Sequence, residues 1–223
     1  MSESRSFTTV CPKCGASIRS VGYPFIIRGR DIAVDTALKD GRLFELTCPS
    51  CGYFDLATYR CTYFDPASHT LIVFDRLSPE DEVKSYADAQ KDAFTIGSRV
   101  PSMRWVTHAD ILAEKARILD FGLDDRAVEI AKLKTQEWMT GLDELHSYAQ
   151  LIFGETTDQG DLVFEVYGLL DEDNRTVIYY RSDYDLIVAE LNDAGAGDDF
   201  IVDRAWAERF MKRRMLECAE GIG

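Results

Sequence analysis

The sequence predicts an α+β protein, in which a zinc-ribbon-like antiparallel sheet with packed helices is followed by a smaller α+β unit. Two Cys-Pro-X-Cys motifs lie among strand-like segments near the start of the chain. Apolar residues then recur at helical spacing to about residue 140. Segments rich in β-forming residues return after about residue 155. We therefore expect a zinc-ribbon-like domain with a helical extension over 1–150 and a C-terminal α+β unit over 151–223, packed as two domains or as one.

Strands and one short helix are expected around the two motifs. The helix covers residues 31–39 and is ended by Asp40-Gly41. The 33 residues between the motifs are long for a bare ribbon, so we expect them to pack on the same sheet. The expected strands cover residues 7–10, 16–19, 23–28, 43–47, 53–64 and 71–74.

The rest of the chain alternates between helical and strand patterns. Ser78-Pro79 followed by two acidic residues is a typical helix start, and that helix is expected to run to about Phe94. A hairpin turn is expected at the acidic residues 171–174. Further helices are expected at about 108–121, 124–139, 184–191 and 203–219, and further strands at 103–106, 162–167 and 176–180.

The cysteines carry the strongest functional signal. Cys11, Cys14, Cys48 and Cys51 form two copies of Cys-Pro-X-Cys-Gly. A Cys-x-x-Cys turn directs two sulfurs at one centre, and two such turns supply the tetrahedral four-sulfur shell that zinc favours. Proline stiffens each turn, and the glycine permits a positive φ that lets backbone N–H groups approach the thiolates. These residues are predicted to hold one structural Zn²⁺, which has no open position for water.

Disulfides, redox-active dithiols and iron–sulfur clusters also use closely spaced cysteines. Disulfides need an oxidising compartment, and no export signal is recognised in the sequence. A thioredoxin-like dithiol normally occurs once, at the start of a helix, whereas both motifs here precede strand-like residues. Iron–sulfur clusters also accept four cysteines, but the ferredoxin spacings differ from this one. Zinc is therefore the favoured interpretation.

The two remaining cysteines differ in their surroundings. Cys61 lies in an aromatic, strand-like run, and Cys218 lies near the end of the last expected helix. We expect both to be small buried hydrophobic residues. Cys61 stays open as a further metal ligand that the site does not need.

A family resemblance follows from these motifs. Two Cys-Pro-X-Cys knuckles near the N-terminus resemble those of the bacterial and archaeal CpXC-domain proteins. The stretches from Arg104 to Lys115 and from Gly122 to Lys132 are similar to the segment that follows the knuckles in that family. The resemblance covers roughly residues 7–133. It implies a zinc-ribbon-like domain in a prokaryotic protein, and it implies no reaction and no substrate.

Charge and hydropathy limit the partners of the chain. Residues 1–60 carry 8 basic and 6 acidic side chains, whereas residues 61–223 carry 17 and 33. A surface this acidic repels a polyanion, which disfavours nucleic-acid binding by the whole chain. No apolar run approaches the roughly 20 residues of a membrane span. We therefore expect a cytoplasmic protein that does not enter a membrane.

Two hypotheses for the function come from these observations. The first is a non-enzymatic zinc module for protein interaction or regulation, which presents aromatic residues such as those of 23–25 and 53–54. The second is nucleic-acid binding, either through the ribbon or through a cationic patch on the last helix. An enzyme with a site in the C-terminal part is a less favoured alternative, because no catalytic or cofactor-binding motif is present. The basic residues in question are Lys13, Arg19, Arg28 and Arg30 in the ribbon and Arg209, Lys212, Arg213 and Arg214 in the helix.

Overall fold

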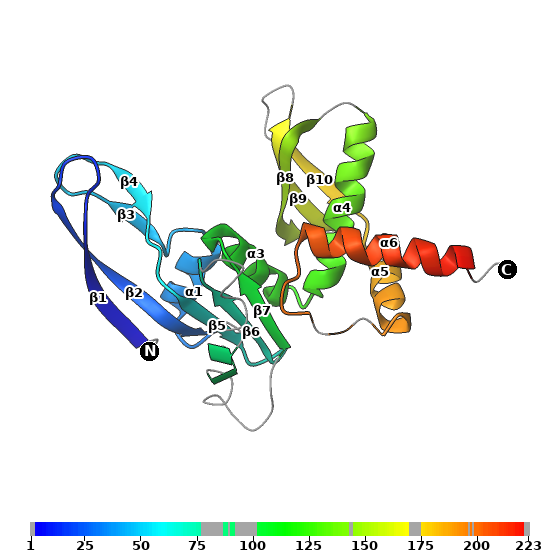
Figure 1. Cartoon of the computed structure of the whole chain (residues 1–223), viewed down its shortest axis with the longest axis horizontal. Helices are drawn as coiled ribbons and strands as arrows, with labels where there is room; N and C mark the ends of the chain where they lie inside the picture. The colour runs from blue at the N-terminus through cyan, green and yellow to red at the C-terminus, as the bar shows by residue number, and fades with distance from the viewer. Residues whose placement is uncertain are drawn as a thin grey trace. The chain divides into compact units, whose positions relative to one another are not determined.

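Over the residues that it describes, the computed structural model combines helices with three β-sheets (Figure 1), which confirms the α+β class. Its contacts divide the chain into two compact units, Met1–Ala116 and Arg117–Gly223. The structure describes residues 3–76, 87–88, 90–91, 102–142, 145–169, 175–195, 197 and 199–220.

The division between the units lies inside helix α3 (Ala109–Asp120), whereas the sequence suggested a change of structure near residue 150. Residue 150 lies within strand β8 (Leu145–Thr156), which pairs along its length with β9 (Leu162–Leu169). A boundary there would separate two hydrogen-bonded strands of one sheet. The change from helical to strand-like sequence patterns near residue 155 therefore falls within unit 2.

Unit 1 is built on a five-stranded sheet with the order β1-β2-β5-β6-β7. The expected sheet was antiparallel, but β2 pairs with β5 and β6 with β7 in parallel, so the sheet is mixed. Parallel neighbours need a long crossover, and residues 28–60, which include the second knuckle, provide one between β2 and β5. The strands are β1 (Glu3–Val10), β2 (Ser17–Ile27), β5 (Cys61–Asp65), β6 (Thr70–Phe74) and β7 (Ser102–Val106).

The crossover from β2 to β5 holds helix α1 (Ile32–Lys39) and a two-stranded hairpin of β3 (Glu45–Thr47) and β4 (Phe54–Leu56). The helix begins as expected, because the Asp31 carboxylate accepts a hydrogen bond from the Val34 N–H. It packs on the sheet, where the buried Tyr63 hydroxyl donates to Asp35 at 3.0 Å. The expectation that the segment between the knuckles packs on the same sheet is confirmed.

A buried carboxylate holds the turn between β5 and β6. Asp65 accepts hydrogen bonds from the N–H groups of Ala67 and Ser68, from the Ser68 hydroxyl at 2.6 Å and from Arg28 at 3.1 Å. Burial opposes ionisation of this carboxyl, but these donors outweigh it and lower the pKa of Asp65 below its ordinary value. The turn therefore depends on a charged form of Asp65.

Unit 2 packs three helices on one face of an antiparallel sheet with the order β10-β9-β8. Buried and exposed side chains alternate along β9, where Phe164 and Val166 are buried and Glu165 is exposed. Phe153 lies opposite Phe164 and shares its core. The remaining elements are α4 (Asp125–Gly141), β10 (Arg175–Tyr179), α5 (Arg181–Asp193) and α6 (Arg204–Glu220).

The main element missing from the sequence prediction is β8. Its signal was the alternation of Ala149, Leu151 and Phe153, all of which are buried. The helix expected from 78 to 94 and the turn expected at 171–174 lie wholly or mostly outside the described residues. Among the helices that are described, none has the length and apolar character needed to cross a membrane.

Replacing Asp65 with Asn is expected to lower the free energy of unfolding by about 2–3 kcal/mol at neutral pH, because it removes a charged acceptor from four donors. Urea titrations of the wild type and the variant measure this difference. The wild-type contribution is present above the ordinary carboxyl pKa of about 3.9 and is lost as the pH falls through the lower folded-state pKa. The free energies of unfolding of the wild type and of Asp65→Asn should therefore converge in acid.

Asp40→Asn is the matched control, because Asp40 pairs with Arg42 at the surface, where side chains are about half exposed. It should change stability by no more than about 0.5 kcal/mol. Equal effects of the two substitutions would contradict the role assigned to Asp65.

Candidate metal centre

The two Cys-Pro-X-Cys-Gly motifs fold into the same turn. In the first, the Cys11 N–H donates to the Ala16 carbonyl at 2.8 Å and the Gly15 N–H donates to the Cys11 carbonyl at 2.9 Å. In the second, Cys48 and Gly52 make the equivalent bonds at 2.8 and 3.0 Å. Gly15 and Gly52 have φ of 73° and 68°, the left-handed conformation that the sequence predicted for them.

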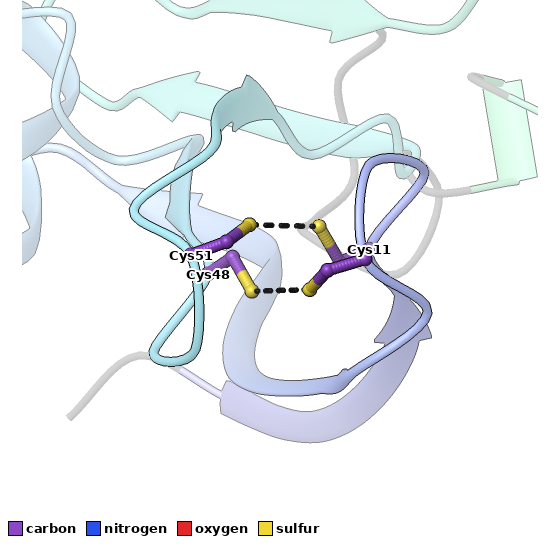
Figure 2. A group of neighbouring side chains, drawn as sticks. Cys11, Cys48 and Cys51 are labelled. Carbon is purple, nitrogen blue, oxygen red and sulfur yellow. Dashed lines mark hydrogen bonds between the residues drawn. The ribbon is translucent and has the colours of Figure 1, made fainter.

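The two turns bring four sulfurs together. The Sγ atoms of Cys11 and Cys51 lie 3.7 Å apart, and those of Cys14 and Cys48 lie 3.6 Å apart (Figure 2). All four lie within 4.8 Å of one another. A tetrahedral site with metal–sulfur bonds of about 2.3 Å has edges of about 3.8 Å, whereas a disulfide requires about 2.05 Å. The spacing therefore fits four sulfurs around one metal ion.

The backbone of the second turn favours an ionised sulfur. The N–H of Cys51 and then that of Ser50 donate to the Cys48 sulfur and lower the pKa of Cys48 to about 6. At Cys51 the Tyr53 N–H also lowers the pKa, but burial and the three neighbouring sulfurs outweigh it and raise the pKa to about 12. Each further thiolate is thus opposed by those already present. A bound cation removes this repulsion, which couples metal binding to proton release.

Apolar side chains from both hairpins surround the sulfurs. The buried residues Ile18, Leu46 and Ala57 form one cluster with Cys11 and Cys48. Such a shell limits access of water to a thiolate site.

Tyr59 ties this shell to the sheet. Its hydroxyl accepts a hydrogen bond from the Tyr23 N–H at 3.2 Å, and its ring contacts those of Phe7 and Phe44. A Cβ at Gly22 would lie only 3.2 Å from the ring, so a larger residue there would push the Tyr59 ring away by a few tenths of an ångström. Burial raises the pKa of Tyr59 to about 12, and the phenol stays neutral. The sequence indicates this role of Tyr59 only through the aromatic run around it.

Cys61 lies on β5 and is fully buried, outside the group of four sulfurs. Burial raises the pKa of its thiol to about 12, so it is neutral. This agrees with the expectation of a small buried hydrophobic residue. Cys218 lies in α6, but its side chain is outside the described part of the chain.

Two of the basic side chains considered for nucleic-acid binding are paired with carboxylates. Lys13, Arg19 and Arg30 are exposed, whereas Arg28 is paired with Asp65. On α6, Arg214 pairs with Glu190 and Glu217, which also raises its pKa. Acidic neighbours thus offset part of the charge that the sequence suggested for nucleic acid.

Comparison with known proteins identifies the family. A family model described as CpXC protein matches residues 7–132, more than half of the chain. The chain belongs to the CpXC family. No curated protein and no solved structure matches it. The match to the CpXC model begins in β1, includes all four clustered cysteines and ends within α4.

Replacing Cys48 with Ser is expected to reduce the metal content from about one ion per chain to a small fraction and to lower the thermal stability of the N-terminal region, because metal binding and folding are coupled. Elemental mass spectrometry and thermal unfolding of protein purified under reducing conditions measure both effects. Cys61→Ala is the control, since Cys61 is equally buried but lies outside the sulfur group. It should keep its metal. Unchanged metal content and stability in Cys48→Ser would disprove the four-cysteine site.

Proposed function

We propose that this CpXC protein is a non-enzymatic, zinc-stabilised module that acts by binding another protein. The observation that carries the proposal is the position of exposed Phe54, three residues after the last clustered cysteine. Its side chain is 54% exposed on a short strand that ends the second knuckle. A metal-held hairpin of this kind presents an aromatic side chain at little cost in conformational entropy.

Zinc in a structural role is supported by the donor set. Four thiolates complete a tetrahedral shell, so no position is left for water or a substrate. Zinc has no redox chemistry of its own and accepts this geometry without strain. Iron also accepts four sulfurs, and the identity of the metal therefore has its own test.

A protein partner is favoured over nucleic acid by the surface of the β3–β4 hairpin. Phe54 and Leu56 alternate with Asp55 on β4 and lie opposite Thr47 and Glu45 of β3. The exposed side chains of Phe54 and Leu56 therefore share one face of the hairpin with the carboxylate of Glu45. The other aromatic segment that the sequence favoured, residues 23–25, lies within β2 and is half-buried, so it contributes less exposed surface.

Elemental analysis of the untagged wild-type protein, purified reduced, is expected to find about one zinc and no iron per chain. A chain that carries iron would contradict the structural-zinc proposal. A chain with no metal would restore a dithiol role for the two motifs.

Replacing Phe54 with Ser is expected to weaken partner binding at least about tenfold, as for other central aromatic contacts, and to leave the metal content unchanged. Quantitative affinity capture from cells that express the protein compares the wild type with the variant. Ile178→Ser is the matched control, since Ile178 on β10 in unit 2 is 53% exposed. Capture that is equal for all three proteins would contradict the proposal.

The same preparations distinguish the nucleic-acid alternative. Fluorescence anisotropy with mixed-sequence RNA and DNA should show no binding at low salt. Binding that weakens steeply with added salt would favour nucleic acid instead, because it reports released counterions.

A further inference from the structure

A groove of about 490 Å³ lies beside the metal centre in unit 1. One wall is the run Phe7–Val10 of β1, and the other is the run Asp55–Tyr59, which leaves β4. The lining is completed by Pro12 of the first knuckle, Ile18 of β2, Leu46 of β3 and Arg76, which follows β6. The groove therefore lies between β1 and the segment that leaves β4, and its volume is within the range of ligand-binding clefts.

The backbone of β1 offers unused hydrogen-bonding groups along this groove. The Cys11–Ala16 pair is hydrogen-bonded, so the register makes Thr9 and Phe7 the next residues that bond to β2. The residues between them, Thr8 and Val10, direct their N–H and C=O groups away from β2. No other described strand pairs with this edge, because β1 ends the sheet. An open edge of this kind accepts another strand.

The opposite wall, which leaves β4, also has a backbone group that is directed away from its paired strand. The Ala57 N–H donates to the Phe44 carbonyl at 2.7 Å, so the register directs the backbone groups of Leu56 away from β3. The Leu56 N–H is already taken by the Asp55 carboxylate at 2.8 Å. The Leu56 carbonyl is left on the free edge of β4. Both walls thus present main-chain groups to whatever lies between them.

The side chains of the groove indicate the chemistry of the occupant. Val10 is 66% exposed and Leu56 is 46% exposed, which gives apolar contacts on both walls. The exposed Arg76 makes no hydrogen bond or ion pair with any other described residue. Asp55, the one carboxylate of the lining, is engaged by the neighbouring N–H. The unpaired cation calls for a carboxylate from the partner.

We propose that this groove binds an extended peptide segment of a partner protein, which adds as a strand to the free edge of β1. Alternate apolar side chains of the peptide contact Val10 and Leu56, and one acidic side chain pairs with Arg76. An extended peptide is the occupant because its repeating N–H and C=O groups match a strand edge. The proposal rests on the proposed protein-binding function and adds the site and the class of partner.

The test uses a phage-displayed library of random dodecapeptides, selected against the full-length, metal-loaded protein. Selected sequences are expected to combine one or more acidic residues with alternating apolar residues. A peptide synthesised from the selection is then titrated by fluorescence anisotropy against variants of the groove. Failure to select any such peptide would overturn the proposal.

Thr8→Pro removes the outward N–H, and proline is tolerated on an edge strand at such a position. Thr8→Val is the matched control, since it keeps the N–H and the shape of the side chain. The proline variant should weaken the peptide about fivefold to tenfold and the valine variant should not. Arg76→Glu should weaken it at least about tenfold, whereas Arg42→Glu, outside the groove lining, should not. Equal affinities across these variants would overturn the proposal.

Hydrogen exchange gives a second measurement if Thr8→Pro loses metal or unfolds. Bound peptide should protect the amide hydrogens of Thr8 and Val10 in the wild-type protein, and unchanged exchange there would overturn strand addition. Light scattering tests for self-association. A dimer formed through β1 would mean that a second copy of the chain occupies the groove, which would refute the peptide proposal. Phe54 lies outside the groove lining. If Phe54→Ser loses partner capture but Thr8→Pro does not weaken peptide binding, the groove proposal is refuted and the proposed protein-binding function is not.

Discussion

The N-terminal half of this CpXC protein depends on bringing four thiol groups to one point. Cys11, Cys14, Cys48 and Cys51 come from two hairpins that also share a small apolar cluster around the sulfurs. The backbone favours one thiolate at Cys48, whereas the surrounding sulfurs oppose another at Cys51. A bound cation would stabilise all four thiolates together, which would link the position of both hairpins to the availability of metal.

The effect of that centre extends into the sheet through β2. Its first half pairs with β1 behind the first knuckle, and its last residues, Phe25 to Ile27, pair in parallel with β5. Tyr59 also fixes the middle of β2, because its ring packs on Gly22 and its hydroxyl accepts a hydrogen bond from the Tyr23 N–H. A change at the metal site would thus be transmitted to β2, because residues of both knuckle hairpins line the groove beside β1.

Unit 2 has a different physical basis. Its stability comes from an ordinary apolar core in which Phe153, Phe164 and Trp206 pack between one sheet and three helices. Trp206 is further fixed by its indole N–H, which donates to Asp199 at 2.6 Å. None of the four clustered cysteines belongs to this core.

Local chemistry is what the sequence by itself determined. The knuckle turns follow from the order Cys-Pro-X-Cys-Gly, and the limits of α1 follow from Asp31 and Gly41, because each depends on residues only a few positions apart. Tertiary structure alone decided the parallel pairing of β2 with β5, the packing of Tyr59 on Gly22 and the division inside α3. These features join residues far apart in the chain, and the pairing of distant segments is set by the packing of the whole unit, which no local pattern records.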